Sequence, residues 1–383
     1  MLLRIAGRVP ANAQEALAHS SIRTVRPDRH RRADAPACRG APQIHSKADS
    51  NVKKILNDPQ AYVDEMLDGL CLAHPELARR GEGGRVVVRR GGAFAGKVGI
   101  VTGGGSGHLP VFLGYVGEGL LDSCAVGNVF AGPRMDDCIE AMRAADGGAG
   151  VLQLYGNYGG DRMNFEMAAE MLELEGMKTA SVRVSDDVAS APPEQREKRR
   201  GVAGLVLVYK AAGARAAAGA TLEEVAATAR KANDACRTIG VALTPCVVPE
   251  SGKPSFEIAD GEVEFGMGIH GEPGIWRGPL KSADALADEM LERVLPELAV
   301  SRGDRLAVLV NSLGATPSEE LYILYRRIAT VLAGRGIDIA FSLVGRYATS
   351  MEMAGASLSV MKLDADLEAL LAAPATCPFW SVR

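Results

Sequence analysis

The chain has 383 residues, of which 47% are hydrophobic and 23% charged, and its formal net charge is −4. That length allows two domains of ordinary size, and the composition is typical of a soluble globular protein. No apolar run approaches the ~20 residues that a membrane-spanning helix needs, and the acidic balance gives no electrostatic basis for binding nucleic acid. We therefore expect no membrane anchor and no nucleic-acid partner.

Seven cysteines are scattered along the chain without a CxxC pair. An odd number of cysteines without paired spacing favours reduced thiols in a cytoplasmic protein over a disulfide framework or a zinc site. The six histidines do not cluster either. The sequence therefore predicts no metal site on this chain.

Residues 1–50 differ from the rest, because they contain nine Lys or Arg residues against four acids. They include the Arg-rich piece RTVRPDRHRR but neither the apolar core of a secretory signal nor a sustained periodicity. An organellar transit peptide and a disordered tail both fit this composition, and we favour the disordered tail. The organised sequence is expected to begin at residue 51.

Strands and helices alternate through residues 51–235. An amphipathic helix is expected near the start, because apolar residues recur at helical spacing between Val63 and Leu72. The elements that follow are expected as strands at 85–90 and 97–103, a short helix and a strand within 115–130, a helix at 135–147, a strand at 150–156, a helix at 162–176 and a strand at 179–187. This alternation argues for an α/β domain with a mostly parallel sheet flanked by helices.

Residues 205–239 are rich in alanine and predict helices. The composition then changes near residue 235, and the turn signals ESGKP and ADGE separate strand-like pieces, which suggests more antiparallel structure. The later elements are expected as a helix at 283–298, a strand at 305–314, a long helix at 318–336 and two strands within 337–364. The predicted parts are the basic extension 1–50, an N-terminal α/β domain at 51–235 and a C-terminal mixed or antiparallel α/β domain at 236–383.

The first glycine-rich segment with candidate site residues is VTGGGSGHLP, residues 101–110. A strand that runs into glycines lets backbone N–H groups approach a ligand closely, because no Cβ intervenes. The segment has neither the GxxxxGK[ST] pattern nor the third glycine of a GxGxxG, so it does not fit a nucleotide loop. His108 at its end is equally compatible with a structural and a functional role.

The second segment is YGNYGGDRMNF, residues 155–165. Asp161 follows two glycines and precedes an apolar helix, a position that favours a helix N-cap. A carboxylate at a helix start is also well placed to accept a proton from a substrate hydroxyl. The two roles compete for the same oxygens, and the residues alone favour the cap.

The third segment is GMGIHGEPG, residues 266–274, which holds His270 among four glycines and a proline. This composition fits neither a helix nor a strand interior. No second histidine lies within zinc spacing. We therefore expect an exposed, unpaired imidazole that acts as a nucleophile or a hydrogen-bond donor.

Five motifs together resemble the substrate-binding K subunit of the dihydroxyacetone kinase family: GGGSGH, GNYGGDRMNF, RRGVAG, GKPSFE and GIHGEPG. The resemblance runs from about Asn51 to the C-terminus, and GIHGEPG is its most specific motif. It implies that His270 adds to the carbonyl carbon of a short ketose to give a covalent hemiaminal. It also implies that Asp161 is the base on the hydroxyl that is phosphorylated, and that His108 hydrogen-bonds the substrate. The same resemblance assigns substrate binding to Gly104, Gly105, Gly132 and Gly156.

In that family the nucleotide is held elsewhere, on a separate L domain or subunit. The resemblance therefore implies that this chain binds no cofactor itself. ATP, or a tightly bound ADP, and Mg²⁺ are expected on a DhaL-like partner, and the chain is expected to form a homodimer. Catalysis is then mostly the positioning of an in-line phosphoryl transfer.

Three positions depart from the family pattern: Leu109 replaces an acid, Gly132 a serine and Gly156 a lysine. The two glycines remove side-chain volume and hydrogen-bond donors, and we hypothesise a ketose larger than dihydroxyacetone, such as the tetrulose erythrulose. Neutral drift is the alternative. A ketose-sensing paralogue without phosphoryl transfer is also open, although Asp161 favours an enzyme because a sensor needs no base. The missing glycine pattern argues against a dinucleotide-dependent dehydrogenase.

Overall fold

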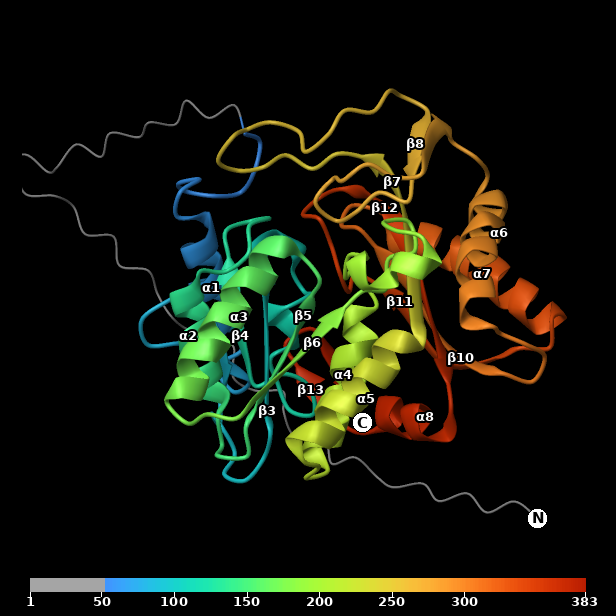
Figure 1. Ribbon diagram of the computed structural model, residues 1–383. Helices are drawn as coiled ribbons and strands as arrows, with labels where there is room; N and C mark the ends of the chain where they lie inside the picture. Colours follow the sequence, from blue (N-terminus) through green and yellow to red (C-terminus); the bar gives the residue numbers. More distant parts are fainter. Residues whose placement is uncertain (1–51) are drawn as a thin grey trace, which may run out of the picture. The chain divides into compact units, whose positions relative to one another are not determined.

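Two six-stranded β-sheets organise the chain (Figure 1). The computed structural model describes residues 52–383. The predicted basic extension, residues 1–50, lies outside the described residues. Within them the α/β class with one mostly parallel and one mixed sheet is confirmed.

The first sheet has the strand order β1-β2-β4-β3-β5-β6. Its strands are β1 (Ala78–Arg80), β2 (Val86–Arg89), β3 (Gly99–Gly105), β4 (Ser123–Gly127), β5 (Val151–Gly156) and β6 (Thr179–Val184). Strands β4, β3, β5 and β6 run parallel, whereas β1 and β2 pair antiparallel at one edge. Strands β3, β4 and β5 are buried throughout, as expected of a sheet covered by helices, whereas β6 at the edge is partly exposed.

Helices cover both faces of the first sheet. Helices α2 (Met135–Ala145) and α3 (Gly159–Leu174) share a core cluster with side chains from one face, such as Val101. Helices α1 (Tyr62–Ala73), α4 (Leu205–Ala217) and α5 (Leu222–Asp234) pack with side chains of the other face, such as Ile100. Successive strand residues point to opposite faces, so each strand contributes to both clusters.

The second sheet has the order β11-β10-β12-β7-β8-β9 and is mainly antiparallel, with one parallel pair, β10 and β11. Its strands are β7 (Cys236–Thr244), β8 (Glu262–Phe265), β9 (Trp276–Pro279), β10 (Arg305–Ser312), β11 (Asp338–Gly345) and β12 (Ala354–Leu363). Helices α6 (Ala283–Val294) and α7 (Ser318–Gly334) cover one face. Helix α8 (Ala365–Ala372) and the hairpin β13 (Ala375–Cys377) with β14 (Trp380–Val382) close the chain.

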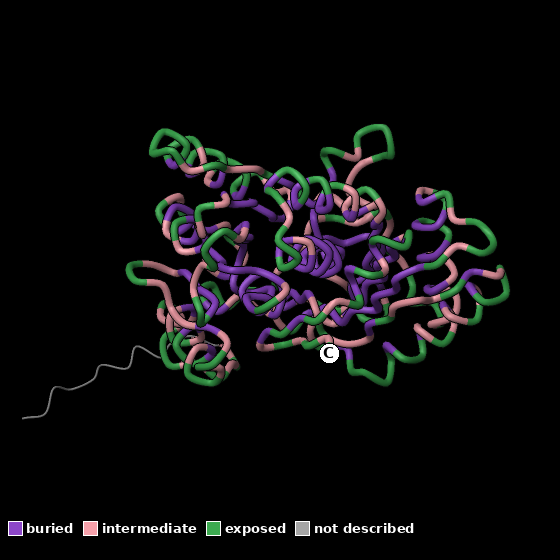
Figure 2. Tube along the Cα trace, turned by 90° about the horizontal axis from the view of Figure 1, so that it is seen from below, coloured by how far each residue is buried: buried purple, intermediate pink, exposed green. Residues whose placement is uncertain are grey.

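Helix α4 is buried on all sides, and Figure 2 shows buried residues concentrated in the interior. Its core cluster includes Leu207 together with Leu309 of the second sheet and Leu371 of α8. The alanine-rich sequence therefore has a packing reason beyond helix propensity, because small side chains let neighbouring elements approach. The predicted boundary at residue 235 stays a prediction.

Two predicted elements differ from the observed ones. Residues 236–244 form strand β7, although the alanine-rich stretch predicted helix through 239. The short helix expected after Tyr115 is absent from its place in the described chain, where a 3₁₀ turn, Leu113–Tyr115, precedes β4. Gly117 and Gly119 both disfavour a helix here, and Gly119 has φ +68°, which an α-helix does not allow.

Leu72, which the helical spacing assigned to an apolar face, is 81% exposed.

No helix in residues 52–383 combines the length and the apolarity that crossing a bilayer requires. The six cysteines in this range are all free thiols, five of them buried.

Candidate functional site

The three glycine-rich segments place His108, Asp161 and His270 around one site. His108 closes a 3₁₀ turn directly after β3, and Asp161 lies in the first turn of α3, just after β5. Strands β3 and β5 are parallel neighbours, so both residues follow the carboxyl ends of adjacent strands. Ligand sites of open α/β sheets occur at such ends. The loop between β8 and β9 brings in His270.

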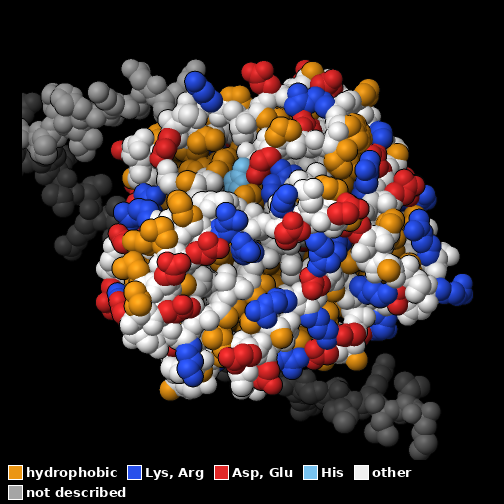
Figure 3. Space-filling model, in the orientation of Figure 1, with side chains coloured by type: hydrophobic (Ala, Val, Ile, Leu, Met, Phe, Trp, Pro, Cys, Tyr) orange, Lys and Arg blue, Asp and Glu red, His pale blue; other side chains and the backbone are white. Residues whose placement is uncertain are grey.

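The imidazole of His270 is enclosed by aromatic rings. Its ring centroid lies 4.6 Å from that of Tyr158, 4.7 Å from that of His108 and 5.9 Å from that of Phe130, each edge-on. The side chain is only 22% exposed, and its Nδ1 lies 3.0 Å from Glu272 Oε1. The prediction of an exposed, unpaired ring was therefore wrong. Figure 3 shows a histidine side chain reaching the surface between charged and hydrophobic side chains.

The glycines beside His270 make room for an ion pair behind the loop. A Cβ at Gly268 would lie 2.2 Å from Glu272 Oε2 and 2.5 Å from Arg200 Nη1. Gly271 has φ +81°, a conformation that favours glycine. The absence of a side chain at Gly268 therefore lets Glu272 and Arg200 pack against the loop that carries His270.

His108 is completely buried and is held in one orientation. Its Nδ1 lies 2.7 Å from the Thr349 carbonyl oxygen, which can only accept, so Nδ1 carries the proton. Burial, and then the His270 ring, lower the pKa of His108 to about 3. The ring is therefore neutral at neutral pH, and its Nε2 is an acceptor without a partner in the described chain.

Asp161 is not a helix cap. Helix α3 has Tyr158 at its N-cap position, without a side-chain cap, and Asp161 is the third helical residue. The capping interpretation is therefore wrong, and the carboxylate oxygen Oδ1 has no hydrogen-bond partner within residues 52–383. Burial raises the pKa of Asp161 to about 6, against the opposing effect of His270. Such a pKa suits a general base near neutral pH.

Unpartnered polar atoms gather at this site. Among the described residues, four buried side-chain atoms lack a hydrogen bond: His108 Nε2, Gln153 Oε1, Tyr158 OH and Asp161 Oδ1. Two of them, in His108 and Tyr158, belong to rings that contact His270. Asp161 lies close enough to His270 for that ring to lower its pKa. Buried polar atoms in native proteins are nearly always bonded. The atoms of His108, Tyr158 and Asp161 therefore mark a place where a small ligand rich in hydroxyl groups can bind.

The four candidate glycines are each constrained by close neighbours. A Cβ at Gly104 would lie 2.3 Å from the Phe112 ring, and one at Gly105 would lie 2.1 Å from the Val129 carbonyl oxygen. At Gly132 a Cβ would lie 3.0 Å from Asp161 Oδ1, and at Gly156 it would lie 3.1 Å from the Tyr158 ring. The space beside Gly156 is therefore filled by a tyrosine. Substrate binding by these glycines stays a prediction.

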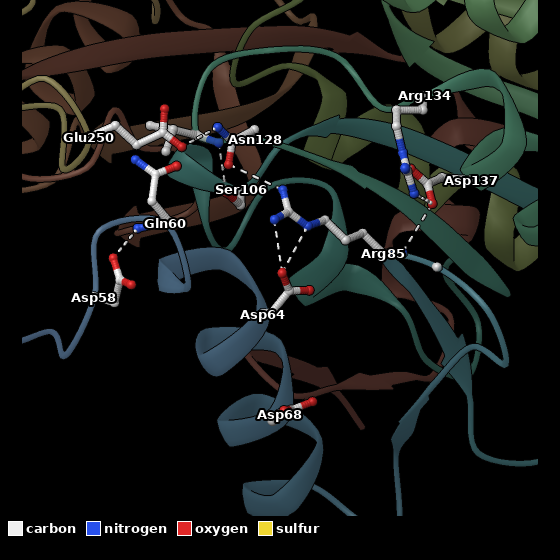
Figure 4. Close-up of polar contacts among 12 residues, drawn as sticks. Asp58, Gln60, Asp64, Asp68, Arg85, Ser106, Asn128, Arg134, Asp137 and Glu250 are labelled. Atoms are coloured by element: carbon white, nitrogen blue, oxygen red, sulfur yellow. Dashed lines mark hydrogen bonds and ion pairs between the residues drawn. The ribbon is translucent and has the colours of Figure 1, made fainter. Parts of the chain in front are cut away.

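A polar cleft of about 940 Å³ opens beside Gly132. Figure 4 shows its side chains: Arg85 lies between Asp64, at 2.9 Å, and Asn128, at 3.2 Å. Arg134 pairs with Asp137 at 2.9 Å. Gly132 therefore lies between the unpartnered Asp161 oxygen and this cleft.

Sequence reasoning missed Tyr158, Phe130 and Arg200 as parts of the site. Tyr158 stands inside the motif GNYGGDRMNF, and Arg200 is the second arginine of RRGVAG. Both motifs carried a signal, but only the fold brings their side chains to His270. Within residues 52–383 no group of three or more His, Cys, Asp or Glu side chains is arranged to hold a metal ion.

Comparisons with known proteins show which family the chain belongs to. The Dak1 domain model matches residues 68–379. The chain is 46% identical over 313 residues to the PTS-dependent dihydroxyacetone kinase 1, dihydroxyacetone-binding subunit DhaK, of Listeria innocua, covering 82% of this chain and 95% of that protein. It is 41% identical over 328 residues to the L-erythrulose kinase of Pectobacterium atrosepticum, covering 85% of this chain and 55% of that protein.

A solved structure resembles the fold over most of its length. The dihydroxyacetone kinase operon co-activator DhaQ superposes with a TM-score of 0.77 at 32% identity, covering 82% of this chain and 97% of that one. Relatives with kinase and co-activator names therefore share this architecture. From the matched domain and these identities, the chain belongs to the Dak1 domain family and is a DhaK-like member of it.

Proposed function

We propose that this chain is the substrate-binding subunit of a dihydroxyacetone-type kinase, which holds a short ketose as a covalent hemiaminal on His270. The observation that carries the proposal is the set of unpartnered buried atoms of His108, Tyr158 and Asp161 around this imidazole. A ketose supplies a carbonyl carbon for the ring nitrogen and hydroxyl groups for the other atoms. Glycerol has no carbonyl and would be rejected.

Each side chain has a role that follows from its hydrogen bonds. His270 Nε2 attacks the carbonyl carbon, because Nδ1 is engaged by Glu272. His108 Nε2 accepts a hydrogen bond from a ketose hydroxyl, since its Nδ1 is committed to Thr349. Asp161 Oδ1 accepts the proton of the terminal hydroxyl as that oxygen attacks a phosphoryl group. The backbone of Gly104 and Gly105 lines the pocket.

The phosphoryl donor comes from a partner. A DhaL-like subunit would bring ATP, or a tightly bound ADP rephosphorylated in place, together with Mg²⁺. The cleft beside Gly132 is the approach that leads to the base. The name of the Listeria relative specifies a dihydroxyacetone-binding subunit, which supports such a division of labour. We further propose a cytoplasmic homodimer.

Erythrulose is the second candidate substrate, supported by the similarity to an L-erythrulose kinase. Gly132 places no side chain between Asp161 and the cleft, whereas the Tyr158 ring fills the space beside Gly156. A kinetic comparison of dihydroxyacetone with both erythrulose enantiomers, in the presence of the nucleotide-bearing subunit, tests this choice. A tenfold advantage of dihydroxyacetone in kcat/KM, ~1.4 kcal/mol, would remove the tetrulose.

A ketose sensor is the third candidate, supported by the structural likeness to a co-activator. The buried, unpartnered Asp161 oxygen favours the kinase, because a sensor has no use for a base with a raised pKa. Native mass spectrometry with dihydroxyacetone, erythrulose and glycerol tests the binding step common to all three candidates. We expect both ketoses to bind the wild type and not His270→Ala, and glycerol to bind neither. Equal ketose binding by His270→Ala would contradict the covalent mechanism.

A further inference from the structure

A chain of charged side chains, Glu272, Arg200 and Asp187, begins at Nδ1 of His270. Glu272 Oε1 lies 3.0 Å from His270 Nδ1, and Glu272 Oε2 accepts the backbone N–H of His270 at 3.0 Å. Arg200 Nη1 lies 3.6 Å from the same Oε2. Both carboxylate oxygens of Glu272 are therefore committed to the imidazole residue and its support.

Arg200 is itself fixed from several directions. Its Nη2 lies 2.8 Å from Asp187 Oδ2, and its Nε donates to the same oxygen at 2.9 Å. Its backbone N–H donates to Ser190 Oγ at 3.0 Å. The Asp187 side chain is buried, and its Oδ1 accepts the Ala189 N–H at 3.0 Å. These bonds tie the arginine to the segment after β6.

We propose that Glu272 is a positioning residue for His270: it holds the proton on Nδ1 so that Nε2 carries the attacking lone pair, and Arg200 with Asp187 holds Glu272 in place. The inference rests on the proposed function for its chemical purpose. A carboxylate behind a histidine fixes the tautomer and stabilises the imidazolium that forms, as in catalytic triads. Burial alone would raise the pKa of Glu272, but His270 and Arg200 lower it to about 2, so the carboxylate is ionised.

The covalent step is balanced as follows. The Nε2 lone pair forms the bond to the carbonyl carbon, and the C=O π electrons move to oxygen. That oxygen takes a proton from water, while the ring keeps its Nδ1 proton and becomes an imidazolium. The ionised Glu272 stabilises this positive ring. One proton is taken up overall, so the adduct becomes less stable as the pH rises. Because the Glu272 carboxylate stabilises the positive ring, the adduct persists to higher pH than it would without that charge.

The other charged and titratable groups around the ring differ in effect. His108 is kept neutral by burial, and the Tyr158 hydroxyl is also neutral because burial raises its pKa well above the usual value. Asp161 is the only other acidic residue that we assign to the site, and burial raises its pKa as well. Glu272 is therefore the one carboxylate that contacts the ring nitrogen among the residues described here.

The decisive variant is Glu272→Gln. Glutamine keeps an oxygen that can accept the His270 backbone N–H, so the loop retains that bond while the charge is lost. The matched control is Glu368→Gln, which removes a carboxylate of similar exposure that is paired with Arg305 at the start of β10. Arg200→Lys tests the second link, because lysine keeps the charge but not the fork that grips Asp187.

The first measurement needs no sugar. ¹⁵N NMR of histidine-labelled full chain, assigned with His270→Ala and recorded at alkaline pH, reports which ring nitrogen carries the proton. We expect Nδ1–H in the wild type and in Glu368→Gln, a mixture of tautomers in Glu272→Gln, and a smaller change in Arg200→Lys. An unchanged Nδ1–H tautomer in Glu272→Gln would overturn the proposal.

The second measurement uses dihydroxyacetone as the probe and follows the adduct across pH. Hydrogen bonds to charged groups contribute enough to predict a roughly ten- to hundredfold lower formation constant in Glu272→Gln, with its loss on raising pH shifted to lower pH. A constant and pH midpoint equal to those of the wild type would also overturn the proposal. If the wild type forms no adduct, the proposed function fails, and the tautomer result still decides the role of Glu272.

Discussion

A side chain at position 132 would change how strongly Asp161 binds a proton, and Gly132→Ser tests this directly. A Cβ at position 132 would lie 3.0 Å from Asp161 Oδ1 and 3.2 Å from its Cγ. A serine hydroxyl, one bond further, can donate to that oxygen after a shift of a few tenths of an ångström. The oxygen has no other partner in the described chain, so the new bond is not a replacement for an old one.

The size of the effect follows from the charge of the acceptor. A hydrogen bond to a charged group contributes about 1.5–3 kcal/mol, and one pH unit corresponds to ~1.36 kcal/mol. Donation to the ionised form therefore lowers the pKa of Asp161 from its value of about 6 by roughly one to two pH units. Gly132→Ala adds the carbon without the donor and is the matched control.

Two assays follow from this reasoning. A ¹³C NMR titration of labelled aspartate, assigned with Asp161→Asn, reads the pKa in the chain alone. The pH profile of kcat/KM with the nucleotide-bearing subunit reads the same group as its acidic limb, because a base works only when deprotonated. We expect this limb to move to lower pH in Gly132→Ser, with a lower plateau from the weaker base. Identical titrations for the serine and alanine variants would refute the reasoning.

Three further predictions concern single side chains. Burial raises the pKa of Asp161 from 3.8 to about 6, so the folded state binds its proton more tightly and loses stability as pH rises between these values. The variant Asp161→Asn should therefore be about 2–3 kcal/mol more stable to unfolding than the wild type at pH 8, with little difference at pH 4 and no phosphorylation. Equal stability of the variant and the wild type at both pH values would contradict this. Tyr158→Phe removes a buried hydroxyl without a partner and should leave urea stability unchanged or higher while weakening ketose binding in calorimetry; unchanged binding would remove Tyr158 from the site. Glu297→Ala leaves two buried arginines unpaired and should cost about 3–5 kcal/mol in urea unfolding, whereas a loss below about 1 kcal/mol would show that solvent compensates for the pair.

Periodicity predicted most of the fold because long elements carry a repeated signal. Strand β3, which runs into GGGSG, and helix α3, which contains Asp161, both had clear sequence patterns and clear ends. Strand β7 was missed because Cys236–Thr244 follows an alanine-rich stretch and gains its strand character from pairing with β12, residues distant in sequence. Local preference cannot report such a partner.

The site was predicted only in part, for a similar reason. The motifs named His108, Asp161 and His270, and the fold brings the elements that carry them to one place. The environment of each side chain depended on distant contacts: the Thr349 carbonyl oxygen orients His108, and Arg200 supports Glu272. The glycines around His270 suggested an open ring, whereas they make room for the partly buried side chains of Glu272 and Arg200.

The covalent bond to His270 is the central claim, and one NMR measurement tests it most directly. Dihydroxyacetone labelled with ¹³C at its carbonyl carbon is added to full chain with ¹⁵N-labelled histidine. We predict a tetrahedral carbon signal with one-bond coupling to a histidine nitrogen in the wild type, and neither feature in His270→Ala. A carbonyl carbon that stays trigonal when bound to the wild type would contradict the account.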